Sequence, residues 1–211
     1  MLVDKKMKVS DFFIESIDYK TAKPFVTKWH YSASVRGLHV SYCFGLYTPN
    51  GKFGLPKLIG VMMYGVPAMP DVGKKYCDLN PDLVLELNRL CCIDDTPTNT
   101  ESYFIGQTMR WLKKNTKYRV IVSFADTAQG HEGTIYKATN FKHKGMTAGA
   151  KALFVDGERL HQRMLTKKCP KGDEIRRRIK SGDDESIWTE QLPPKHIYVY
   201  YLNKKLNRIY N

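Results

Sequence analysis

Residues 118–141, YRVIVSFADTAQGHEGTIYKATNF, hold the pattern that decides the fold. The first eight, YRVIVSFA, form a largely apolar run typical of a strand buried on both faces of a sheet. The polar segment Asp126–Gly133 then predicts a turn, and Thr134–Asn140 predicts a short helix. This segment is therefore expected to place functional side chains at the end of a buried strand, where α/β sheets usually bind ligands.

The sequence before this segment predicts a meander of strands with two helices. Tyr19–His30 has Ala22, Phe25, Val26 and Trp29 at spacings of three and four, the stripe of an amphipathic helix. Thr98 precedes Glu101 by three positions, a capping-box pattern, so a second helix is expected to run from there to about Lys114. The expected strands are residues 11–18, 40–47, 57–66 and 83–93, the middle two forming a hairpin around TPNGKFGLP.

The C-terminal third predicts two further strands, at residues 152–155 and 196–202. The complete order is strand, helix, three strands, helix, strand, helix and two strands. This order matches an α/β fold of the GNAT (acyl-CoA N-acyltransferase)-like type, with a mixed, mainly antiparallel central sheet flanked by helices. We expect one domain over residues 1–211 with a basic insertion at about residues 157–181.

Composition narrows the classes of protein that this chain can be. Its 34 basic and 21 acidic residues give a net charge of +13, which favours a polyanion as partner, and double-stranded DNA is the expected one. Five cysteines without CxxC spacing argue against a disulfide framework or a zinc knuckle. We find neither a signal peptide nor a membrane-spanning segment, so we expect a cytoplasmic protein with no membrane partner. Oligomeric state is left open.

The strand–turn–helix segment holds five candidate side chains. Asp126 is placed to hold an amine or act as a general base, or merely to cap a turn. Tyr136 and Asn140, four residues apart, are expected on one helix face, either bonding a substrate or packing on the sheet and closing the helix. Ser123 and His131 are candidate substrate-binding residues through their neighbourhood.

Two other segments hold candidate site residues. In WHYSASVRG, His30 is a candidate base and Tyr31 a candidate stacking partner for a nucleobase, although a lone histidine is usually structural. In LVLELNRLCC, two-residue alternation predicts Glu86 and Asn88 on one strand face and Arg89 on the other. Polar side chains on so apolar a strand are costly unless partnered, which indicates a site or a network.

A basic span predicts the DNA contact, because clustered lysines and arginines release counterions from a duplex. Residues 158–181 hold nine lysines and arginines, and the alternative reading is an ordinary solvated loop. A second contact is considered near residues 63–76. No histidine spacing predicts a metal site. The candidate DNA-binding residues are Arg36, Arg159, Arg163, Lys167, Lys168, Arg176, Arg177 and Arg178.

Three segments resemble the phage Mom family in the same order along the chain. They are WHYS at residues 29–32, ELNRLC at residues 86–91 and SFADTAQGHEGTIYKATNF at residues 123–141. The resemblance implies a GNAT-like transferase that installs a carbamoylmethyl, glycinamide-like group on the N6 amine of adenine in DNA, inside an infected bacterial host, protecting phage DNA from restriction. Its expected catalytic residues are His30, Tyr31, Arg89, Asp126 and Tyr136.

The expected donor departs from ordinary GNAT enzymes. Ordinary GNAT enzymes share a glycine-rich loop at a helix N-terminus, and the backbone amides of this loop hold the pyrophosphate of acetyl-CoA. This chain has CCIDDTPTNTESYFIG there, and Asp94 and Asp95 would repel a pyrophosphate. We therefore hypothesise an activated glycine such as glycyl-tRNA. An iron requirement has been suggested for the family, and the sequence neither supports nor contradicts it. The alternatives are an acetyltransferase acting on a small amine or protein, and a non-catalytic basic DNA-binding protein.

Overall fold

The computed structural model describes residues 7–49, 55–160, 165 and 172–210. Within them, contacts divide the chain into two compact units. The first unit comprises residues 1–124, 133–144 and 197–211, and the second comprises residues 125–132 and 145–196. The predicted basic insertion belongs to the second unit.

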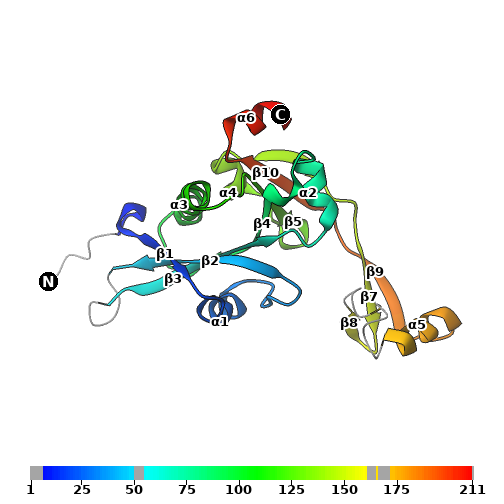
Figure 1. The fold of residues 1–211 in the computed structure, drawn as a ribbon. Helices are drawn as coiled ribbons and strands as arrows, with labels where there is room; N and C mark the ends of the chain where they lie inside the picture. The colour runs from blue at the N-terminus through cyan, green and yellow to red at the C-terminus, as the bar shows by residue number, and fades with distance from the viewer. Residues whose placement is uncertain (1–6, 50–54, 161–164, 166–171, 211) are drawn as a thin grey trace. The chain divides into compact units, whose positions relative to one another are not determined.

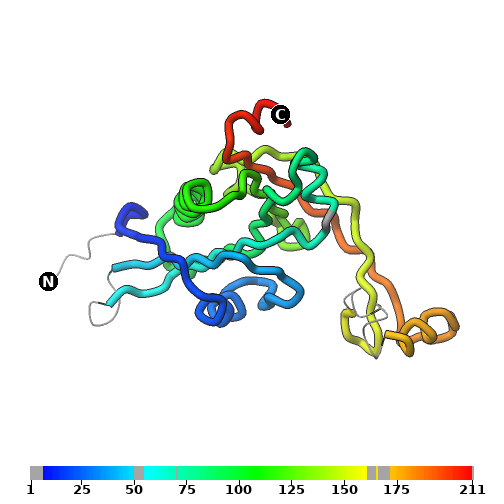
Figure 2. Tube along the Cα trace, viewed as in Figure 1, coloured from blue at the N-terminus to red at the C-terminus, as the bar shows by residue number. Residues whose placement is uncertain are grey.

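A seven-stranded sheet organises the first unit, in the order β1-β2-β3-β4-β5-β10-β6 (Figure 1). Its ladders from β1 to β4 are antiparallel, and β4 and β5 are parallel. Figure 2 shows how β10, the last strand along the chain, enters this sheet, where it lies between β5 and β6. The strands are β1 (Phe13–Ile17), β2 (His39–Thr48), β3 (Lys57–Val66), β4 (Val84–Cys92), β5 (Val120–Asp126), β6 (Lys142–Met146) and β10 (Lys195–Tyr201).

Helices cover both faces of this sheet (Figure 1). On one face, Ala22 and Val26 of α1 pack on Val61 and Met63 of β3. On the other face, Thr108 of α3 lies 2.8 Å from the hydroxyl of Tyr64. The helices are α1 (Tyr19–Trp29), α2 (Pro70–Tyr76), α3 (Thr100–Asn115), α4 (Thr134–Ala138), α5 (Gly172–Ser181) and α6 (Lys204–Tyr210), with 3-10 turns η1 (Val9–Asp11), η3 (Pro81–Leu83) and η4 (Thr127–Gln129).

The second unit contains a three-stranded antiparallel sheet in the order β8-β7-β9. Its strands are β7 (Lys151–Val155), β8 (Glu158–Leu160) and β9 (Ile187–Gln191). The predicted strand at residues 152–155 is thus confirmed. The basic span, read from sequence as a loop or a DNA contact, includes helix α5.

The predicted order of elements from β1 to α4 is confirmed, with three local differences. The capping box is wrong, because α3 begins at Thr100 after Asn99, whose side chain makes no capping bond. Helix α4 ends at Ala138, so Asn140 does not share its face with Tyr136. Residues 70–76 form helix α2 rather than an open loop. No helix in the described ranges is long and apolar enough to cross a membrane.

Candidate active site

A β-bulge in β4 shapes the candidate site. Across the β3–β4 ladder, Arg89 faces Met63 and Leu87 faces Tyr64, so Asn88 has no counterpart on β3. One extra residue in a strand shifts the alternation of all the side chains that follow it. The alternation predicted from sequence therefore fails at this position.

The bulge brings three polar side chains of β4 to one face. Directly opposed residues in an antiparallel pair share a face, and Glu86 lies opposite Gly65, two residues from Met63 on β3. Glu86 and Arg89 therefore share a face, contrary to the sequence prediction. A Cβ added to Gly65 would lie 2.7 Å from Asn88 Oδ1, which places that amide on the same face. A glycine is needed here because the backbone carbonyl of His39 and the Asn88 amide together occupy the space of a side chain.

The segment after α1 supplies the aromatic part of the site on this face. His30 is buried, and its ring lies 4.2 Å from that of Tyr31, which is 51% exposed. The Ser32 amide donates to His30 Nδ1 over 3.1 Å. A neutral His30 therefore carries its proton on Nε2, an assignment made from this bond, and is suited to donate a hydrogen bond rather than to act as a base.

Arg89 joins these two segments. Its Nε donates to the Ser34 carbonyl over 3.0 Å, and its guanidinium also donates to the Asn88 carbonyl over 2.7 Å. Burial lowers the pKa of Arg89, while Tyr31 and Glu86 act in the opposite direction. The side chain keeps its charge, since even a lowered arginine pKa lies far above neutrality.

Ser123 and Tyr136 form a buried hydroxyl pair where β4 and β5 stop pairing. The parallel ladder ends at Glu86 and Val122, and Ser123 Oγ then lies 3.2 Å from the Leu87 carbonyl and 2.8 Å from Tyr136 Oη. Serine has one proton, which it can donate to Tyr136 Oη or to the Leu87 carbonyl. When Ser123 donates to Tyr136 Oη, the phenol keeps its own proton for a substrate.

The environment keeps Tyr136 protonated. Burial raises the pKa of Tyr136 to about 12 against the hydrogen bond with Ser123, and Tyr31 and Glu86 raise it further. These two groups come from the segment after α1 and from β4. The first unit therefore brings together a phenol, a carboxylate, a guanidinium and an exposed ring. Glu86 was noted in the sequence analysis but was not among its catalytic candidates.

Other predicted residues have different surroundings. Asp126 and His131 belong to the second unit, where Asp126 is bonded to Lys195 Nζ over 2.8 Å and to the Ala128 amide. Although burial acts oppositely, the contacts with Lys195 hold the pKa of Asp126 below its ordinary value, which weakens it as a base. Asn140 lies beyond α4, exposed and with φ of 63°.

The predicted DNA contacts are only partly available to a phosphate. Arg36, Arg159 and Arg177 are exposed. Arg176 is paired with Asp173, and Arg178 is held by two carboxylates, Asp156 at 2.7 Å and Asp184 at 2.6 Å. Arg163, Lys167 and Lys168 lie outside the described residues.

The described parts of the chain contain no recognisable metal site. Within those ranges, His, Cys, Asp and Glu side chains do not gather in groups of three or more that could hold an ion. The described cysteines, Cys43, Cys77, Cys91 and Cys92, are unpaired thiols.

A known protein family matches nearly the whole sequence. The sequence model of the Mom protein family matches residues 11–211. The chain belongs to the Mom protein family. It is also 24% identical over 210 residues to the methylcarbamoylase Mom of Escherichia phage Mu, covering 94% of this chain and 78% of that one.

Solved structures similar to this Mom-family chain show the same fold. Spermidine/spermine N-acetyltransferase SpeG from Vibrio cholerae has a TM-score of 0.51 and 8% identity, covering 95% of this chain and 98% of SpeG. Arabidopsis thaliana NAA60 in complex with a bisubstrate analogue has a TM-score of 0.50 and 10% identity, covering 90% of this chain and 97% of NAA60. The comparisons confirm the predicted family, the GNAT-like fold and the assignment to the transferases.

Proposed function

We propose that this Mom-family protein modifies phage DNA by installing a carbamoylmethyl group on the N6 amine of adenine. One observation carries the proposal. Asn88 Oδ1 is buried and has no hydrogen-bond partner among the described residues. A buried acceptor without a partner is costly, and this one shares a strand face with Glu86 and Arg89. A substrate N–H would satisfy it, and transfer of a carbamoylmethyl group accords with the name of the phage Mu relative, a methylcarbamoylase.

The proposed adenine pocket uses Asn88 and Tyr31. Asparagine is the usual partner of adenine, because its amide matches the N6 donor and the N7 acceptor. Tyr31 presents an exposed ring on which a base can stack. The target base leaves the duplex to reach these side chains, since its amine is otherwise held in pairing within the stack.

Proton transfer is assigned to Glu86 and Tyr136. The N6 lone pair is delocalised into the ring, so the amine needs a base that removes its proton as the new bond forms. Glu86 is the carboxylate of the cluster, and its Oε2 accepts from the Ala68 amide over 3.2 Å. Tyr136 stays protonated and donates to the leaving oxygen, and Arg89 stabilises negative charge that develops nearby.

Acetyl-CoA does not fit the start of α3. Backbone amides at a helix N-terminus bind a pyrophosphate only where nearby charge permits. Asp94 and Asp95 are exposed in the turn before α3, and Asn99, at the N-cap position, has a left-handed backbone conformation and makes no side-chain capping bond. We derive no step through acetyl-CoA.

An activated glycine such as glycyl-tRNA is the proposed donor. The N6 amine attacks the ester carbonyl, the N–C bond forms, the C–O bond to the ribose breaks, Glu86 takes the amine proton and Tyr136 protonates the ribose oxygen. N6-glycyladenine has the same atoms as carbamoylmethyladenine. The free glycyl amine then attacks C6 and displaces the original N6, which becomes the amide nitrogen of the product, so the isomerisation needs no further reactant.

Purified protein, duplex DNA and tRNA charged with carbon-14 glycine test this donor. We expect label in the DNA with the wild type and about 100-fold less with Tyr136→Phe, which lacks the acid. With DNA carrying nitrogen-15 at N6, the heavy atom is expected in the side-chain amide. No transfer of label would exclude this donor, and thermal stabilisation by acetyl-CoA would favour the acetyltransferase alternative.

A further inference from the structure

The positive charge of the protein is concentrated away from the basic span. The sequence ranges of the first unit contain 23 basic and 11 acidic residues, a net charge of +12, whereas those of the second contain 11 and ten. In the second unit, Arg176 and Arg178 are also committed to carboxylates. A polyanion is therefore attracted mainly by the first unit.

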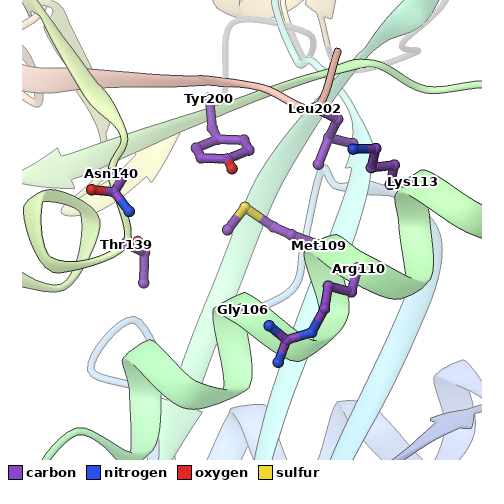
Figure 3. A pocket seen from close by; sticks show the side chains of 8 residues that line it. All are labelled: Gly106, Met109, Arg110, Lys113, Thr139, Asn140, Tyr200 and Leu202. Atoms are coloured by element: carbon purple, nitrogen blue, oxygen red, sulfur yellow. The ribbon is translucent and has the colours of Figure 1, made fainter. Parts of the chain in front are cut away.

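Two adjoining hollows in the first unit gather four of these cations. One, of about 290 Å³, lies between α3 and β10 (Figure 3). The other, of about 220 Å³, shares Asn140 and Tyr200 with it and extends to the start of α6. We call the two together the α3–β10 groove. Its four basic side chains are Arg110, Lys113, Lys142 and Lys204.

The charges of the α3–β10 groove are exposed and uncompensated. All four basic residues are exposed to solvent, and the described residues that line the two hollows include no carboxylate. Within the described ranges, none of the four takes part in an ion pair. They differ in this respect from Arg178, and they are available to neutralise phosphates.

The wall of the groove opposite α3 suits a nucleotide. Tyr200 and the amide of Asn140 lie along it, across from Met109 and Arg110 (Figure 3). The Tyr200 ring lies 5.4 Å from that of Phe141, which fixes its position. An aromatic face and a side-chain amide next to cations serve sugar and base as well as phosphate.

The groove lies near Tyr136 of the candidate site. Tyr198 and Tyr200 are two residues apart on β10 and so share a face of the sheet. The Tyr198 ring lies 5.2 Å from that of Tyr136. The groove therefore begins about 7 Å along the strand from the aromatic contact of Tyr136.

We propose that the α3–β10 groove binds the sugar–phosphate backbone of double-stranded DNA beside the target adenine. This assignment rests on the proposed function, which makes DNA the substrate. The groove holds the strand by charge, without reading its sequence, while the cluster around Asn88 receives the flipped base. The groove thereby takes the role predicted for Arg176 and Arg178.

Salt dependence of DNA binding tests the groove. Each phosphate contact contributes about 0.9 to the slope of log affinity against log salt. We expect Arg110→Gln/Lys113→Gln and Lys142→Gln/Lys204→Gln each to lower the slope for a duplex oligonucleotide by roughly 2. The matched control, Lys8→Gln/Lys57→Gln, removes two exposed charges near the paired ends of β2 and β3, where Met7 contacts Thr48, and should leave the slope nearly unchanged. Unchanged melting temperatures would verify folding.

Three results would overturn the assignment. Equal slopes for groove and control variants would show that the groove makes no phosphate contact. Tighter binding of an RNA hairpin than of duplex DNA, with only RNA binding lost in the groove variants, would assign it to RNA. Stabilisation by a free nucleotide alone, with DNA binding intact, would assign it to a small phosphorylated ligand.

These binding measurements need no donor, so they separate the two proposals. If the wild type modifies adenine but the groove variants bind DNA as it does, the groove assignment fails alone. If the groove variants lose salt-dependent binding but the wild type itself forms no modified adenine, the proposed function fails alone.

Discussion

Arg89 Nε donates a hydrogen bond to the carbonyl oxygen of Ser34 over 3.0 Å, joining β4 to the segment that follows α1. The bond depends on the bulge at Asn88, which turns Arg89 toward the face that α1 covers. A regular strand would direct this guanidinium to the α3 face. The bulge thus places Arg89 within reach of the segment that carries Tyr31.

Arg89→Lys is expected to lower kcat/KM by about 10- to 100-fold with little loss of stability. Lysine keeps the charge but lacks the planar guanidinium, which donates to the carbonyls of Ser34 and Asn88 at the same time. Steady-state kinetics on duplex DNA would measure the loss, with thermal melting as the control. Full activity in this variant would show that the two-carbonyl contact is dispensable.

Glu86→Gln is expected to reduce turnover by at least about 100-fold while DNA affinity stays unchanged, because the amide cannot accept the amine proton. Asp126→Asn is the comparison, since Asp126 is already bonded to Lys195. It should retain most of the turnover. If single-turnover assays show a large loss of turnover in Asp126→Asn and little loss in Glu86→Gln, Asp126 and not Glu86 is the general base.

Tyr136 makes a pH-dependent contribution to stability. Its pKa is about 12 in the folded protein and about 10 in an unfolded chain. The contribution is therefore fully present below pH 10 and is lost as the pH rises toward 12, by roughly 2–3 kcal/mol. Urea unfolding of the wild type and of Tyr136→Phe between pH 8 and 12 would measure it, because the other tyrosines cancel in the difference. Parallel curves would show that Tyr136 titrates normally.

Arg178→Gln is expected to lower the melting temperature without changing the salt slope of DNA binding. Its guanidinium is bonded to Asp156, Asp184 and Ser186, and it organises a turn of the second unit. Removing it leaves two carboxylates that repel each other. A lower salt slope at unchanged stability would restore Arg178 as a phosphate contact.

Regular periodicity explains why most of the first unit was predictable. The stripe of α1, the apolar runs of β3 and β4 and the buried strand β5 each follow one period, and the structure confirms their order. The bulge at Asn88 depends on one unpaired residue, and nothing in LVLELNRLCC distinguishes it from a regular strand. Sequence alternation therefore placed Arg89 on the wrong face.

Long-range partners were the other obstacle. Asp156 lies 22 residues before Arg178, and Lys195 lies 69 residues after Asp126, so local sequence shows neither ion pair. A count of basic residues consequently overstated the charge available in the span. The helix face predicted for Asn140 was wrong for a local reason, because α4 ends two residues before it.

The central claim is tested most directly by mass spectrometry of nucleosides from plasmid DNA, after expression of the wild type and of Tyr136→Phe in a bacterial host. The account predicts an adenosine species heavier by a carbamoylmethyl group with the wild type and almost none with soluble Tyr136→Phe. Unmodified adenine with soluble wild type, or equal modification by both proteins, would contradict it.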